Sequence, residues 1–209
     1  MVADGFTVHG ATYGYTTIDR ASHRAITHGV TAYYANLAPS HVAFSSTVAV
    51  VPPWSGRRES NAADLEWRDG QQFGGDFVPS RSYREWGFVA VEPTRARVSL
   101  KRSGEGWVVQ NALGFTAAHL YVDVDGTTFV ADNVADGGEG RLSIVKWKSL
   151  DAGRADGRFS SNVRHRTVEA PLTHGQFLAQ LEGQGFVPSG GISLSMHESE
   201  HFVRGEVEP

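Results

Sequence analysis

Two histidines near the C-terminus have the spacing of a zinc-protease motif. His197-Glu198-Ser199-Glu200-His201 fits H-E-x-x-H and also the inverted form H-x-x-E-H. In such enzymes a helix brings both imidazoles to one face, where they bind zinc, and a glutamate acts as general base on the zinc-bound water. The first question is therefore whether the surrounding sequence places His197 and His201 on a helix.

The residues on both sides of the motif favour strands. Gly190-Gly191 precedes it, and apolar and polar residues alternate over 192–196 and again over 202–207. An extended segment would hold the two imidazoles too far apart for one zinc ion, and a turn at 198–200 would direct them into solvent. We therefore predict no catalytic zinc site here. Metal binding by an exposed His197 and His201 pair remains a separate expectation.

Three aspartates form a second candidate metal site. The stretch "DVDGTTFVAD" (123–132) is similar to a calcium loop, which needs oxygen ligands at positions 1, 3, 5 and 12 and glycine at position 6. Here the glycine stands at the fourth position, and a type I′ hairpin turn explains Asp125-Gly126 without a metal. A shallow calcium site made by Asp123, Asp125 and Asp132 is the minor alternative, and no cofactor is predicted.

Aromatic residues suggest a binding surface for sugars. Trp54 and Trp67 lie in or near polar loops, while the other three tryptophans begin or end strand-like segments, where packing in the core is usual. Exposed aromatic rings on a β-sandwich can stack on sugars, with Arg57 and Arg58 at the rim of the site. Solvated loop charge is the ordinary explanation of the two arginines.

Most of the chain has the two-residue period of strands. The clearest hairpin places Leu120, Val122 and Val124 on one face before the Asp125-Gly126 turn. Helix signals are few and predict one short helix near 174–182, with a weaker helical signal at 60–67. The strand segments outside this hairpin are 29–36, 41–51, 86–92, 95–102, 106–113 and 141–147.

These elements predict a mainly β protein, an antiparallel β-sandwich of Ig-like or jelly-roll-like type with one or two short helices. We expect a first β region over 1–85 and a compact sandwich over 86–209 that holds the short helix and the C-terminal strands. A single larger sandwich is the alternative. The residues expected in the core are Leu100, Val108, Val122, Val124 and Ile144.

Composition narrows the function. The 209 residues carry a formal net charge of −4, which does not favour nucleic acid as a partner. No run of residues has the length and apolarity of a membrane span, and the N-terminus lacks the features of a signal peptide. Cysteine is absent, which excludes disulfides and thiolate chemistry. If the chain is complete, these features predict a cytoplasmic protein.

Residues 106–145 and the tail "HFVRGEVEP" have a characteristic order of strands and turns. A Trp-Val-Val-x-Asn strand leads to an apolar hairpin with a D-G turn, and a glycine turn leads to a last strand. This order resembles β-sandwich segments in the extracytoplasmic parts of large, uncharacterised bacterial membrane proteins. The resemblance implies a periplasmic or extracellular location, envelope components as partners, and a start at Met1 that is not the start of the whole protein.

The favoured hypothesis is a non-catalytic extracytoplasmic domain, structural or interacting, within a larger bacterial membrane-associated protein. Its partners would be other protein domains or envelope components. A carbohydrate-binding module that uses Trp54 and Trp67 is the second hypothesis. A zinc-dependent hydrolase that uses His197, Glu198 and His201 is the third.

Overall fold

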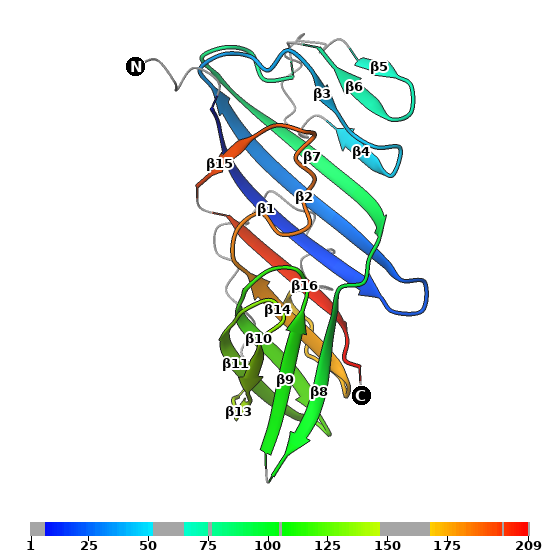
Figure 1. The fold of residues 1–209 in the computed structure, drawn as a ribbon, viewed down its shortest axis with the longest axis vertical. Coiled ribbons are helices and arrows are strands. Elements are labelled where there is room, and N and C mark those ends of the chain that lie inside the picture. Colours follow the sequence, from blue (N-terminus) through cyan, green and yellow to red (C-terminus); the bar gives the residue numbers. More distant parts are fainter. Residues whose placement is uncertain are drawn as a thin grey trace.

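The computed structural model describes residues 7–51, 65–74, 77–104, 106–146, 168–197 and 199–208. Within these residues the protein is built almost wholly of strands, most of them paired antiparallel (Figure 1). The predicted fold class, mainly β and sandwich-like, is confirmed. No helix in the described ranges is long and apolar enough to cross a membrane.

In the part of the chain that the structure describes, sixteen strands make one large sheet and two small ones. Their bounds are β1 (Val8–Asp19), β2 (Arg24–Ala35), β3 (Val42–Ala43), β4 (Val48–Val51), β5 (Leu65–Trp67), β6 (Gln71–Phe73), β7 (Ser82–Pro93), β8 (Arg97–Ser103), β9 (Gly106–Ala112), β10 (Ala117–Val124), β11 (Thr127–Val134), β12 (Glu139–Arg141), β13 (Ser143–Ile144), β14 (Gln176–Leu181), β15 (Leu194–Met196) and β16 (Glu200–Glu206).

The large sheet runs the length of the molecule in the order β13-β11-β10-β14-β16-β1-β2-β7-β4, with β15 also beside β1. Its centre is the antiparallel set β1, β2 and β7, which pair along twelve residues each. The C-terminal strands β15 and β16 both lie parallel to β1, so the first and last described strands are neighbours in one sheet. The expected boundary at 85/86 falls within β7.

The two small sheets cover opposite ends of the same face of the large sheet, which we call the inner face (Figure 1). We call β2, β4 and β7 with β3, β5 and β6 the upper lobe, and β10, β11 and β14 with β8, β9 and β12 the lower lobe. Strands β1 and β16 connect the lobes. The opposite side of the large sheet is the outer face.

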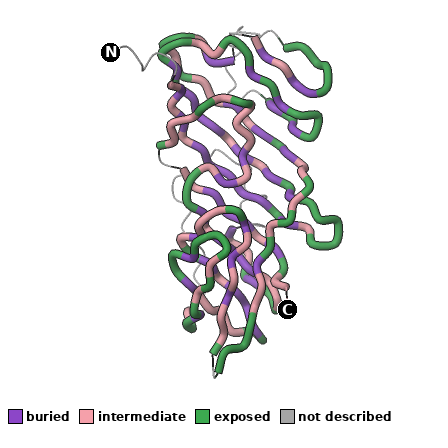
Figure 2. Tube along the Cα trace, in the orientation of Figure 1, coloured by how far each residue is buried: buried purple, intermediate pink, exposed green. Residues whose placement is uncertain are grey.

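The lobes have separate cores, visible as the buried segments in Figure 2. The upper core is dominated by aromatic rings: Tyr33, Phe44, Phe73, Phe77, Trp86 and Phe88. The lower core is mostly aliphatic and is filled by Val98, Val109, Leu113, Leu120, Val122 and Leu181 around Phe177. Each core lies between the inner face of the large sheet and one small sheet.

The predicted hairpin at Asp125-Gly126 is confirmed. Both residues have positive φ, 52° and 80°, as a type I′ turn requires, and β10 pairs with β11 on either side. Val122 is fully buried and Val124 is 7 % exposed. Alternation identified the buried face here because the tight turn leaves the register of both strands intact.

The other core predictions are mixed. Leu100 packs half-buried against the lower core, as expected from its strand. In β9 the buried positions are Val109 and Asn111, so Val108 lies on the other side and is only half-buried. The expectation for Ile144 is wrong: it is 75 % exposed on the two-residue edge strand β13, where no layer covers it.

The predicted helix near 174–182 is wrong, because Gln176–Leu181 is strand β14. This strand lies between β10 and β16 and is buried on both faces, by Phe177 and Ala179 inside and Leu178 outside. Burial on both faces removes the alternation that marks a strand, so periodicity cannot separate it from a helix. In the 60–67 segment, Leu65–Trp67 is strand β5, and 60–64 lies outside the described residues.

Candidate functional site

The two histidines of the HESEH motif lie on opposite faces of the large sheet. Met196 pairs with Gly10, and Glu200 pairs with Tyr13. Three residues separate Met196 from Glu200 in the sequence, whereas two separate Gly10 from Tyr13. The register therefore shifts by one residue, and this bulge inverts which side chains face inward. His197 lies on the outer face and is exposed, whereas His201 lies on the inner face with no exposed surface. The two residues do not form one metal site.

His201 belongs to a buried polar belt between the two cores. Its Nε2 lies 2.8 Å from Thr16 Oγ1, which lies 2.8 Å from Thr27 Oγ1. Phe186 of the lower core and Val187 of the upper core pack over this region. The expectation that His201 would point into solvent is wrong, because β16 places its side chain under the loop that carries Phe186 and Val187.

Burial determines the protonation state of His201, the histidine of this belt. Loss of solvent lowers the pKa of His201 to about 3, so the ring is neutral near pH 7. Its Nδ1 has no hydrogen-bond partner among the described residues. A Cβ built on Gly14 would come 2.4 Å from this Nδ1, so the glycine provides the space that the ring occupies. A neutral, enclosed imidazole with no access to solvent has a structural role.

The three aspartates do not converge. The Asp123 carboxylate is buried and accepts a hydrogen bond from the Gly126 amide at 3.0 Å, while Asp125 is exposed beside His174 at 3.4 Å. Asp132 pairs with His119 across the strands at 2.7 Å, several positions away from the turn. Within the described residues no three metal-binding side chains gather at one point.

The aromatic candidates are only partly described. Trp67 is 61 % exposed on β5, consistent with its expected surface position. Trp54, Arg57 and Arg58 lie outside the described residues, so the predicted sugar platform stays a prediction. Trp86 is buried in the upper core, and its Nε1 donates to the Phe77 carbonyl at 2.8 Å.

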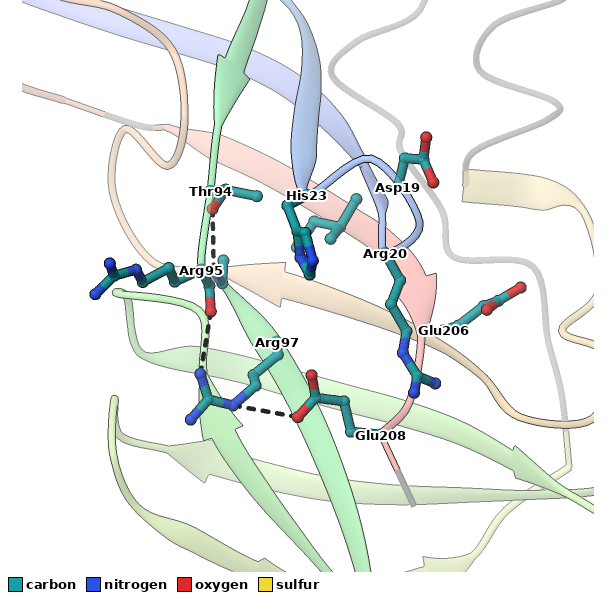
Figure 3. A pocket seen from close by; sticks show the side chains of 10 residues that line it. Asp19, Arg20, His23, Thr94, Arg95, Arg97, Glu206 and Glu208 are labelled. Atoms are coloured by element: carbon teal, nitrogen blue, oxygen red, sulfur yellow. Dashed lines mark hydrogen bonds and ion pairs between the residues drawn. The ribbon is translucent and has the colours of Figure 1, made fainter.

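A cleft of about 160 Å³ lies where the β1–β2 turn meets the β7–β8 connection and the end of β16 (Figure 3). Arg97 is held there by Glu208 at 3.3 Å and donates to the Arg95 carbonyl at 3.4 Å. Figure 3 shows the Arg95 side chain directed away from this pair. The charged residues that line the cleft are Asp19, Arg20, Arg95, Arg97, Glu206 and Glu208, and His23 also contributes to the lining.

The side chains that line this cleft carry mixed charge. Three arginines and three acidic side chains line it, so it has no strong preference for anions or cations. The only hydroxyl group in its lining is Thr94 Oγ1, which accepts a hydrogen bond from the Ala96 amide at 3.0 Å. No side chain in the lining forms a nucleophile–base pair of the kind that hydrolases use.

The outer face of the upper lobe carries exposed apolar side chains. Val51, Val89 and Ile26 lie on adjacent strands and are 47 %, 38 % and 37 % exposed. Further along β2 and β7, Tyr34 lies directly opposite Tyr83. Tyr34 is 42 % exposed and Tyr83 is 60 % exposed. Sequence patterning missed this surface because strands with apolar residues on both faces give no clear alternation.

Comparisons with known proteins give no family. No family model matches the chain, and no curated protein matches it. Among solved structures, the yeast delta-COP-I mu-homology domain is similar with a TM-score of 0.33, 10 % identity, and coverage of 98 % of this chain and 96 % of that one. The same domain in complex with a Dsl1 WxWxV peptide has a TM-score of 0.32 at the same identity and coverage. Similarity at this level defines neither a shared fold nor a shared function.

Proposed function

We propose that this chain is a non-catalytic domain that binds other proteins through the outer face of its upper lobe. The observation that carries the proposal is the group of exposed apolar and aromatic side chains on β2, β4 and β7, namely Ile26, Tyr34, Val51, Tyr83 and Val89. Exposed apolar side chains gathered on one face are typical of protein-binding surfaces, where tyrosine is especially common.

The arrangement of these side chains supports binding at two neighbouring points. Tyr34 and Tyr83 form a cross-strand pair near one end of the strands, and the aliphatic group lies toward the other end. Tyr83 donates a hydrogen bond to the Glu85 carboxylate, which orients the ring on the sheet. Tyrosines fixed on a rigid sheet present a large contact area with little entropy to lose on binding.

Photo-crosslinking tests this proposal in the native cell. A photoreactive phenylalanine analogue at Tyr83 or Val89 should give the same discrete crosslinked protein, and the analogue at Ile144 should not. Ile144 is the matched control because it is 75 % exposed but lies at the lower end of the molecule.

The captured protein is then purified, and we expect Val89→Asp and Tyr83→Asp each to weaken its binding at least about tenfold, as truncated hot spots do. Equal binding by the wild type and both variants contradicts the proposal.

The extracytoplasmic location is part of the same proposal and rests on the resemblance of residues 106–145. The test is the sequence of the complete gene together with fractionation of the source cells. A membrane-spanning segment or export signal beside this segment, with the protein in the envelope fraction, supports it. A complete soluble chain in the cytosolic fraction contradicts it and leaves the binding surface to be tested separately.

A carbohydrate-binding module is the second candidate, favoured by the 61 % exposure of Trp67 on β5. A glycan array followed by titration of the best sugar separates the two functions. Sugar binding that is lost in Trp67→Ala and retained in Val89→Asp identifies the second candidate. Binding of no sugar by the wild-type protein excludes it.

A further inference from the structure

We propose that His9 and His197 form a binding site for a divalent late transition metal, with Cu²⁺ bound most tightly. Their ring nitrogens Nδ1 and Nε2 lie 2.9 Å apart, although the residues are 188 positions apart in the chain. The rings stack with centroids 5.1 Å apart and an angle of 30° between their planes. Neutral imidazole is a ligand that suits copper, nickel and zinc.

The sheet itself sets this juxtaposition. Gly10 of β1 pairs with Met196 of β15. His9 lies just before Gly10 and His197 just after Met196, so the two histidines are diagonal neighbours on the outer face. The His197 amide donates to the Gly10 carbonyl at 2.7 Å, which fixes the backbone of the second histidine beside the first. Two ligands held by paired strands lose little freedom when they bind a metal.

The distance between the nitrogens is close to what a single metal ion bridges. Two metal–nitrogen bonds of about 2.0–2.1 Å that meet at 90° separate the nitrogens by about 2.9 Å, whereas a tetrahedral angle separates them by about 3.3 Å. Among the divalent first-row metals, Cu²⁺ binds nitrogen ligands most tightly, followed by Ni²⁺ and Zn²⁺, so the expected preference for copper rests on the ligand type. A turn of the exposed His197 ring directs both lone pairs at one ion, and water fills the other positions.

This site replaces the pairing that the HESEH motif suggests. His201 is buried on the opposite face and is already engaged with Thr16, so it takes no part in the site. A metal at His9 and His197 would connect the first strand to the segment that leads into the last one. Binding should therefore raise the unfolding temperature as well as give a metal spectrum.

Copper titration of untagged, chelator-treated protein provides the test. We expect one tight Cu²⁺ site whose electron paramagnetic resonance spectrum shows two nitrogen ligands. His9→Ala and His197→Ala should each weaken it at least tenfold, and the double variant should bind no more weakly than the weaker single variant. His41→Ala, which removes an exposed histidine elsewhere, is the matched control and should bind like the wild type.

Thermal unfolding with Ni²⁺ gives an independent measurement. We expect Ni²⁺ to raise the unfolding temperature of the wild type and of His41→Ala, and to leave both His9→Ala and His197→Ala unchanged. The unfolding temperature of each variant is first measured without metal. If His197→Ala fails to fold, His197→Gln replaces it. The proposal is overturned if His9→Ala and His197→Ala keep wild-type copper affinity, or if Zn²⁺ binds more tightly than Cu²⁺ at this pair.

Discussion

The two lobes bury their cores in different ways. In the upper lobe, six aromatic side chains interlock, and Phe77 stacks on Trp86 with centroids 5.0 Å apart and planes 2° apart. In the lower lobe, aliphatic side chains from regular hairpins fill the space between two sheets. Short hairpins place aliphatic residues by alternation alone, whereas the aromatic core depends on residues of loops and very short strands. Regular strand pairing thus suffices to place the core side chains of the lower lobe, whereas the core of the upper lobe also needs the packing of aromatic rings.

The buried belt of Thr16, Thr27 and His201 separates these cores, and its position explains why they do not merge. Gly14 and Gly29 lie on the inner face here, and a Cβ on either would meet Val187 at 2.8 Å or 2.7 Å. The loop that carries Phe186 and Val187 can approach the sheet closely only over these glycines. The belt therefore joins the lobes by polar contacts and close backbone approach.

Breaking the lower core at Val122 should have the largest effect. Val122→Asp places an unpaired charge at a site with no exposed surface, and we expect a loss of roughly 3–5 kcal/mol in the free energy of unfolding. Ile144→Asp is the control, because Ile144 is 75 % exposed, and should change that free energy by about 0.5 kcal/mol or less. Urea unfolding measures both. An unchanged midpoint for Val122→Asp contradicts the assigned burial.

Breaking the upper core at Phe77 sharpens the comparison. Phe77→Ala removes the ring that contacts Tyr33, Phe44, Phe73 and Trp86 and should cost about 3–5 kcal/mol. Because β1 and β16 connect the lobes, we expect tryptophan emission and the far-ultraviolet β signal to change at the same urea concentration. Trp86 lies in the upper core and Trp107 packs against the lower core, so if the emission changes in two separate steps, the lobes unfold separately and the belt does not couple them.

Within the lower lobe, one hairpin is predicted correctly from the sequence and one strand is predicted wrongly, and both outcomes have a physical reason. Asp125-Gly126 sets a tight turn that fixes the register of β10 and β11, so local chemistry determines which residues are buried. Strand β14 is misassigned as a helix because its burial on both faces depends on β10 and β16, which are distant in the chain. No local signal reports that pairing.

The candidate sites show the same limit. The HESEH spacing identifies His197 and His201 as residues of interest, but the one-residue bulge between Met196 and Glu200 determines that their side chains lie on opposite faces of the sheet. That bulge exists only because β15 and β16 both pair with β1. The His9–His197 contact follows from the same long-range pairing, so no spacing rule in the sequence finds it.

The belt makes stability depend on pH. The pKa of His201 in the folded state, about 3, lies below its ordinary value of 6.5, so the unfolded chain takes up the proton first as the pH falls. The stabilisation is fully present above pH 6.5 and is lost progressively between pH 6.5 and 3. We expect a loss of about 2 kcal/mol between pH 7 and pH 5 from this residue.

Urea unfolding at pH 7 and pH 5 measures the dependence, with His201→Gln as the test variant and His41→Gln as the control. Glutamine keeps a polar group near Thr16 but does not titrate. The free energy of unfolding of His201→Gln should therefore change less between pH 7 and pH 5 than that of the wild type. His41 is exposed, and His41→Gln should keep the wild-type pH dependence. If the free energy of unfolding depends on pH equally in His201→Gln and the wild type, a group other than His201 causes the dependence.

The smallest effect is expected at the surface pair His119–Asp132 on the lower lobe. The two side chains are 46 % and 59 % exposed and lie opposite each other on β10 and β11, with Nδ1 and Oδ1 2.7 Å apart. Solvent screens such a pair, and ordering both side chains offsets part of the attraction. Asp132→Asn should therefore cost no more than about 1 kcal/mol, measured by urea unfolding at pH 7 with the conservative Asp136→Asn as control. A loss near that of Val122→Asp would mean that the lower lobe depends on cross-strand polar contacts as much as on its aliphatic core, and the contrast between the lobes would then fail.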